Sequence, residues 1–327
     1  MRRREVIALI GSAAAWPLAA RAQQSNPVKR IGFLSPALEN DPELQAVNAV
    51  FPQELQKLGW AEGRNVQLDR HWGGGDDQRI RVQAQELVAK APDVILVIST
   101  QATAILKQIT GTIPIVFVNV ADPVASGFVA SFARPGGNIT GFTSVEYSVA
   151  GKWLSVLKAI APDTARVMVL FNPTNSNWRG YLPTIEAGAR SLKVDVSVAR
   201  VAGAGDIEQA IAAFAREPGG GMIVLPTGTN VYRERTTALA ARHQLPAVYP
   251  YDYWTASGGL VSYGSDTRDL NRRAAAYVDR ILRGEKVGEL PVQAPVKFEL
   301  VINLKAARAL GLDVPDSLRL LADRVIE

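Results

Sequence analysis

The stretch Val94-Ile95-Leu96-Val97-Ile98-Ser99-Thr100-Gln101 decides the fold class of this chain. Its unbroken apolar run is typical of a strand buried on both faces, as in a parallel sheet covered by helices. Residues 31–34 (IGFL) and 113–118 (IPIVFV) follow the same plan. Between these runs, residues 79–90 place apolar side chains at helical spacing. Alternating strands and helices predict a doubly wound α/β layout.

The second half of the chain repeats this plan. Apolar runs recur at residues 167–171 and 222–225, and LKQITGTIPIVF at 106–117 is echoed by LAARHQLPAVY at 239–249. The pattern of each of the last two segments predicts the end of a helix, followed by an apolar residue and Pro, and then a strand. We therefore expect two similar Rossmann-like lobes, with two unrelated α/β domains as the alternative.

The turn at residues 134–141 (RPGGNITG) separates the two halves, and residues 142–145 (FTSV) then look like a strand that crosses to the second. We predict lobe one at 29–141 and lobe two at 142–265. The remaining segments do not begin a third domain. We expect residues 266–292 to return to lobe one and residues 293–327 to lobe two, so that strands cross between the lobes.

The N-terminus has the features of an export signal. Three arginines precede an apolar stretch at residues 6–20, which is too short to span a bilayer of about 30 Å, and Ala20-Arg21-Ala22 offers a cleavage site. We predict a signal peptide at residues 1–22, Tat-like or Sec, and a periplasmic protein without membrane insertion after cleavage; an N-terminal anchor helix is the alternative. Removing these residues lowers the formal charge from +5 to +2, so we expect no nucleic-acid partner.

The 327-residue chain has no cysteine and only two histidines, His71 and His243. Disulfides and thiolate chemistry are thereby excluded, and His-based metal or triad chemistry is disfavoured. No nucleophile motif or metal-binding motif is present. We therefore expect no catalytic residues, no metal and no cofactor.

Small polar residues stand where the predicted strands end, which is where open parallel sheets bind ligands. Together with helix N-termini they suit a carboxylate. The alternative for each is a cap of the following helix. The candidates are Ser35, Thr100 and Gln101, Asn119, Asn172 and Thr227.

Three more candidates carry other chemistry. Asp122 could pair with a ligand ammonium, or form an Asx turn before Pro123. Tyr249 and Tyr251 follow a strand of lobe two and could cover an apolar or aromatic ligand side chain, or fill the edge of the core.

The chain resembles the ABC transporter substrate-binding proteins of the tryptophan/tyrosine type. The segments that carry the resemblance are 58–65 (LGWAEGRN), 113–117 (IPIVF), 122–124 (DPV), 133–141 (ARPGGNITG), 258–264 (GGLVSYG) and 297–305 (KFELVINLK). The resemblance implies the type I periplasmic-binding-protein fold. It also implies a monomer that captures a small carboxylate-bearing ligand, with an amino acid as the candidate, between lobes that close about a hinge.

The partners that the resemblance implies are an ABC permease and its ATPase subunit. One alternative is a ligand-sensing subunit for a membrane receptor, and another is an exported enzyme with its site in the cleft. The sequence departs from the expected plan at one position. Pro52 falls inside the predicted first helix and should bend that helix or delay its start.

Overall fold

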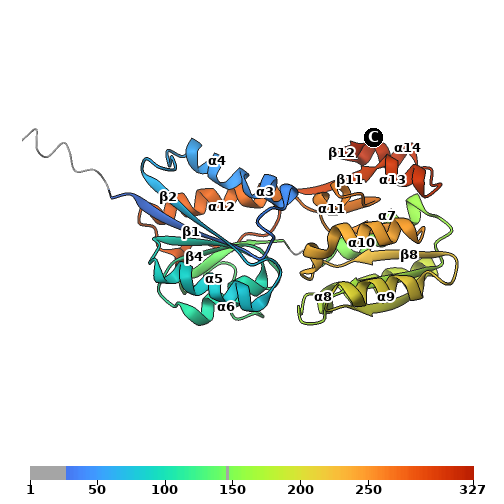
Figure 1. Cartoon of the computed structure of the whole chain (residues 1–327), viewed down its shortest axis with the longest axis horizontal. Coiled ribbons are helices and arrows are strands. Elements are labelled where there is room, and N and C mark those ends of the chain that lie inside the picture. Colours follow the sequence, from blue (N-terminus) through green and yellow to red (C-terminus); the bar gives the residue numbers. More distant parts are fainter. Residues whose placement is uncertain (1–26, 145–146) are drawn as a thin grey trace, which may run out of the picture.

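The structure is a computed structural model that describes residues 27–144 and 147–327. The predicted signal peptide at residues 1–22, and Val145 at the end of the predicted crossing strand, lie outside the described residues. Figure 1 shows two lobes side by side, each with a sheet between layers of helices. Among the described residues, no helix combines the length and apolar character that a membrane span requires.

Lobe one contains a five-stranded parallel sheet in the order β2-β1-β3-β4-β5. The strands are β1 (Lys29–Ser35), β2 (Val66–Trp72), β3 (Val94–Ile98), β4 (Ile115–Val120) and β5 (Ile139–Thr143). Both faces of the sheet are buried, and separate apolar clusters lie against each face. The unbroken apolar runs form strands because helices cover both faces of this sheet.

Lobe two contains a seven-stranded sheet in the order β12-β11-β10-β9-β8-β6-β7. The strands are β6 (Arg166–Phe171), β7 (Asp195–Arg200), β8 (Gly220–Val224), β9 (Ala247–Tyr249), β10 (Val261–Ser265), β11 (Phe298–Asn303) and β12 (Arg324–Ile326). Its first five strands repeat the order of lobe one, and β11 then pairs antiparallel with β10. The predicted fold class, two doubly wound α/β lobes, is confirmed.

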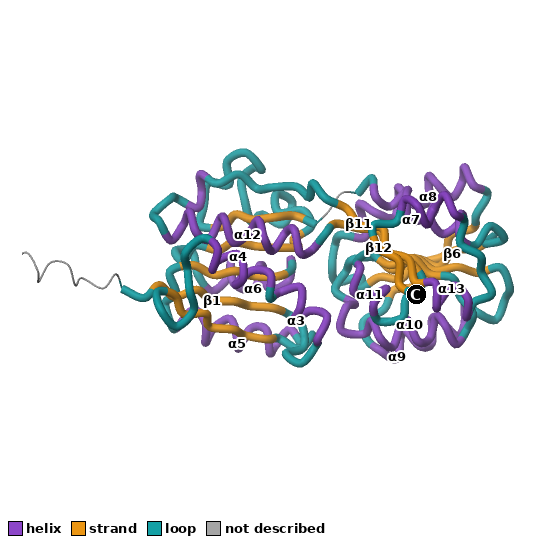
Figure 2. Tube along the Cα trace, turned by 90° about the horizontal axis from the view of Figure 1, so that it is seen from above, coloured by secondary structure: helices purple, strands orange, loops and turns teal. Residues whose placement is uncertain are grey.

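The helices cover both sheets (Figure 2). Those on lobe one are α3 (Pro42–Asn48), α4 (Val50–Lys57), α5 (Asp77–Ala89), α6 (Thr100–Ile109), α12 (Thr267–Leu282) and the 3-10 helix η3 (Val287–Glu289). Those of lobe two are α7 (Val149–Ile160), α8 (Trp178–Leu192), α9 (Ala204–Phe214), η2 (Thr229–Tyr232), α10 (Arg233–Arg242), α11 (Asp252–Ala256), α13 (Leu304–Ala309) and α14 (Asp316–Leu321).

The chain passes between the lobes after β5, again before α12, and again before β11. Helix α12 follows a strand of lobe two but packs on α4 and β4 of lobe one. Thr143, the last residue of β5, donates its backbone N–H to Gln293 C=O at 2.9 Å. The segment before β11 therefore still lies against lobe one at Gln293. The Asp266 N–H donates to Lys297 C=O at 3.0 Å, which joins the second and third connections, and we call the three connections the hinge region.

The first helix is interrupted at Ala49, which separates α3 from α4. Pro52 lies in the first turn of α4, where its missing N–H removes no intrahelical hydrogen bond. The interruption also separates two packing environments. Phe51 and Leu55 of α4 lie in the core of lobe one, whereas Val47 of α3 packs with residues of lobe two. Helix α3 therefore bridges the lobes.

Candidate ligand-binding site

A cavity lies between the lobes and is lined by both of them. Of the predicted site residues, Ser35, Thr100, Gln101, Asn119 and Tyr251 line it. Ser99 and Tyr253, which belong to the same polar and aromatic stretches of sequence as these residues, line it too. The other polar lining residues were not predicted from the sequence: Asn48, Ser144, Asn175, Asn177, Asn230, Thr267 and Asn271. Within the described part of the chain, no Asp, Glu, Lys, Arg or His lines this cavity. A ligand here would meet hydroxyls, amides, backbone groups and apolar surface.

Lobe one supplies its part of the cavity from the ends of β3 and β4. Ser99 has φ +89° and ψ +154°, and Asn119 has φ +62°, both unusual for residues other than glycine. Residues held in such conformations cost about 1–3 kcal/mol each and cluster at functional sites. Ser99 is fixed by two hydrogen bonds: its N–H donates to Val118 C=O at 2.9 Å, and its hydroxyl accepts from Ala102 N–H at 3.3 Å.

The strained turn at Ser99 directs the start of α6 towards the cavity. The first intrahelical hydrogen bond of α6 runs from Thr103 N–H to Ser99 C=O. The N–H groups of Thr100 and Gln101 precede it, so they are available to a ligand. The Thr100 hydroxyl accepts from Ala121 N–H at 3.1 Å and keeps its own hydrogen to donate. This arrangement suits a carboxylate, because the positive end of the helix dipole lies there.

Two other lining residues of lobe one are held by neighbours. The Ser35 hydroxyl accepts from Ala37 N–H at 3.3 Å, at the end of β1. The Gln101 amide donates to the Asp77 carboxylate at the start of α5. Both contacts fix the rim of the cavity from within lobe one.

Tyr251 of lobe two reaches across the cavity. Its hydroxyl donates to Asn119 Oδ1 at 2.7 Å and lies 3.5 Å from Ser144 Oγ. Burial is the largest influence on the pKa of Tyr251 and raises it. The phenol therefore stays protonated and acts as a donor at neutral pH. Tyr251 stacks on Tyr253 with ring centroids 5.3 Å apart, which gives lobe two a flat apolar wall.

A buried ion pair also joins the lobes. Arg233 of α10 donates to both carboxylate oxygens of Asp41, which caps α3; the Nη2 to Oδ1 distance is 2.8 Å. Each side chain is only 5% exposed. Arg233 Nε also donates to Ser257 Oγ at 2.9 Å. This pair and the Tyr251 to Asn119 hydrogen bond hold the lobes against each other.

Three predicted residues, Asp122, Asn172 and Thr227, do not line the cavity, and their polar atoms bond to loop backbone instead. Asp122 Oδ1 accepts from the N–H of Ala125 at 2.9 Å, the Asx turn that was the alternative. Asn172 Oδ1 accepts from the N–H of Thr174 at 3.0 Å. The Thr227 hydroxyl accepts from the N–H of Asn172 at 2.9 Å, which joins the loops after β6 and β8.

Tyr249 does not line the cavity either. It is 1% exposed and stacks on Trp254 with ring centroids 5.2 Å apart. Burial raises its pKa far above the usual range, so it remains a neutral phenol. Its side chain is part of the core of lobe two, which was the alternative to ligand contact.

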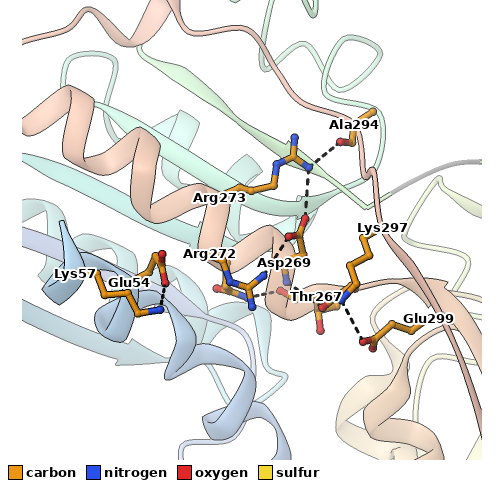
Figure 3. A network of polar contacts seen from close by, with 11 residues as sticks. Glu54, Lys57, Thr267, Asp269, Arg272, Arg273, Ala294, Lys297 and Glu299 are labelled. Carbon is orange, nitrogen blue, oxygen red and sulfur yellow. Dashed lines mark hydrogen bonds and ion pairs between the residues drawn. The ribbon is translucent and has the colours of Figure 1, made fainter. Parts of the chain in front are cut away.

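The first turn of α12 contributes Thr267 and Asn271, which the sequence prediction missed. Figure 3 shows Thr267 beside the charged groups of the hinge region. There, Lys297 donates to Asp266, the N-cap of α12, at 2.8 Å. Burial alone would raise the pKa of Asp266, but Lys297 and the N–H of Asp269 outweigh it and hold that pKa below its usual value. The cap is therefore ionised at neutral pH and fixes the start of α12 beside the cavity.

Known proteins with similar sequences and structures share this architecture. The sequence model of the ABC transporter substrate binding protein family matches residues 36–326. A tyrosine-binding protein from Clostridioides difficile is 25% identical over 290 residues, which cover 88% of this chain and 82% of that protein.

Two solved structures resemble this one with a TM-score of 0.83, and each comparison covers 91% of this chain and 99% of the other. One is a conserved domain protein from Vibrio cholerae, at 26% identity. The other is an ABC domain from Streptococcus pneumonia in complex with L-Trp, at 23% identity. The family match places this two-lobed chain, with a cavity between its lobes, among the substrate-binding proteins. This chain belongs to the ABC transporter substrate binding protein family, a family of solute-binding proteins and not of enzymes.

Proposed function

We propose that this protein is the exported solute-binding component of an ABC importer and that it captures an amino acid with an aromatic side chain. The observation that carries the proposal is the cavity itself: both lobes line it, and Tyr251 bridges it to Asn119. Closure around the ligand would shift the equilibrium between open and closed arrangements. A permease with its ATPase subunit would then receive the ligand from the closed form.

The ligand carboxylate would bind at the start of α6, to the N–H groups of Thr100 and Gln101 and the Thr100 hydroxyl. Tyr251 and Tyr253 would cover the aromatic side chain from lobe two. Among the residues that the structure describes, no Arg or Lys lines the cavity. The N-terminus of α6 is then the group that can hold an anion there, which supports this assignment. The names of the relatives, a tyrosine-binding protein and a complex with L-Trp, point to the same ligand class.

A thermal-shift panel on the protein starting at Gln23 tests the ligand class. The panel contains L-tyrosine, L-tryptophan, L-phenylalanine, acidic and basic amino acids, and neutral sugars. A ligand at 100 times its dissociation constant should stabilise the protein by about 2.7 kcal/mol. A shift with sugars and none with the aromatic amino acids would overturn the proposal.

We also propose the export route, the location and the oligomeric state. Residues 1–22 would be removed as a Tat-like or Sec signal peptide, leaving a periplasmic monomer that begins at Gln23. N-terminal sequencing of protein from a periplasmic extract tests the cleavage. Full-length chain in the membrane fraction would contradict it.

A ligand-sensing subunit of a membrane receptor is the second candidate, because the same closure could be detected by a receptor. Neighbouring genes for a permease and an ATPase would favour the importer. Deletion of this gene should then abolish uptake of the labelled ligand, whereas a sensing role would leave uptake intact.

A further inference from the structure

Two buried oxygen atoms in the cavity have no hydrogen-bond partner in the described part of the chain, Thr267 Oγ1 and Asn271 Oδ1. Thr267 is 6% exposed and Asn271 is 2% exposed, and both line the cavity. They stand four residues apart on α12, so they lie on the same face of that helix. Buried polar atoms in folded proteins are rarely left unpaired, so a missing partner calls for an explanation.

The orientation of the Asn271 amide determines which partner is missing. Its Nδ2 donates to Thr267 C=O at 2.9 Å, so its Oδ1 is the free end and can only accept. The Thr267 hydroxyl can also accept. A hydroxyl can also donate, but a group that contacts both oxygens must donate to Asn271 Oδ1, so a carboxylate, which only accepts, does not fit between them.

We propose that Thr267 Oγ1 and Asn271 Oδ1 form the subsite for the ammonium group of the ligand. This inference rests on the proposed function, since it assigns the second polar end of the amino acid. An ammonium group carries three N–H donors, and both oxygens can accept from it at once. Because no carboxylate lines the cavity among residues 27–144 and 147–327, these neutral oxygens would take the place of the acidic residue that usually meets an ammonium.

The charges around the first turn of α12 permit a cation there. The positive end of the helix dipole opposes it. However, Asp266 caps the helix and Asp269 lies in its first turn, and the nearby cations are paired with these carboxylates: Lys297 with Asp266, and Arg272 and Arg273 with Asp269. Arg268, the cation in the same turn, is engaged by Asp252.

The test compares an amino acid with its deamino analogue by calorimetry, L-tyrosine with desaminotyrosine and L-tryptophan with indolepropionate. Thr267→Val removes one acceptor while keeping the shape of the side chain. We expect it to weaken binding of the amino acid about ten- to a hundredfold, because the lost hydrogen bond involves a charged group. Binding of the deamino analogue should change less than threefold.

Two further variants support the interpretation. Asn271→Ala should show the same selective loss. Thr255→Val is the matched control, because the Thr255 hydroxyl is equally buried and without a partner among the described residues but does not line the cavity. It should leave both affinities unchanged.

The outcomes separate the subsite from the proposed function. A selective loss for the amino acid supports the subsite. Equal losses for amino acid and analogue would overturn the subsite and leave the ligand class standing. If neither compound of either pair bound to the wild-type protein, the proposed function would fail and the subsite with it.

Discussion

The two lobes share one strand order but supply different halves of the site. In lobe one, Ser99 follows β3 and Asn119 is the last but one residue of β4; both have positive φ angles, and both line the cavity. In lobe two, Pro226 and Pro250 follow the ends of β8 and β9, and Tyr251 extends across to lobe one. Topology therefore sets where a ligand can bind, and the residues directly after each strand set which part of the ligand each lobe holds.

The largest expected effect is a loss of stability, and it distinguishes Tyr249, which lies in the core of lobe two, from Tyr251, which lines the cavity. Tyr249→Ala should lower the free energy of unfolding by about 3–5 kcal/mol, because it removes a buried ring from the core. Urea denaturation of the protein without ligand measures this loss. A variant with wild-type stability and weakened ligand binding would move Tyr249 into the site.

The next effect tests how the lobes are held together. Arg233→Met leaves the Asp41 carboxylate without its partner in the closed arrangement, a change that costs about 3–5 kcal/mol in buried pairs. In the proposed open arrangement Asp41 would be exposed to water, so we expect ligand affinity to fall by at least tenfold while the unfolding free energy falls less.

The double variant Asp41→Asn/Arg233→Met is the control for this prediction. It removes the uncompensated charge and keeps the side-chain cap of α3, since Asn caps as well as Asp. It should recover most of the lost affinity in calorimetry. No recovery would mean that Arg233 acts by some route other than its pairing with Asp41.

A smaller effect addresses the lobe-one half of the site. Thr100→Val should weaken binding of the aromatic amino acid by about 1.5–3 kcal/mol, the value of a hydrogen bond to a charged group. Calorimetry measures the change. The control is Thr237→Val, whose hydroxyl bonds to Ser257 C=O within lobe two and does not line the cavity. Equal affinities in wild type and Thr100→Val would place the carboxylate elsewhere.

The smallest effect concerns the contact between the lobes at Tyr251. Tyr251→Phe keeps the ring but removes the 2.7 Å hydrogen bond to Asn119, which is worth about 0.5–1.5 kcal/mol. We expect affinity to fall by less than about tenfold and the fold to remain intact. A larger loss would show that the hydroxyl contacts the ligand directly.

The sequence predicts the fold well because the signals are local. Apolar runs such as residues 94–98 fold as strands buried on both faces, and the repeat of that plan appears as the same strand order in both lobes. Pro52 likewise marks the interruption between α3 and α4.

The site is less predictable because its signals are tertiary. Tyr249 and Tyr251 look alike in sequence, yet one lies in the core and the other at the cavity. The polar groups of Asn172 and Thr227 bond to each other, a contact between two loops that no spacing reveals. Asn271 could be recognised only once α12 is known to return to lobe one with its first turn at the cavity.

The central claim, that the lobes close on an amino acid held between them, has one direct test. The chain has no cysteine, so spin labels at Gln85→Cys on α5 and Gln209→Cys on α9, both exposed, report one distance between the lobes. Pulsed electron paramagnetic resonance should show longer and broader distances without ligand, and a single shorter distance with saturating L-tyrosine or L-tryptophan. An identical distance distribution with and without the saturating amino acid would contradict the account.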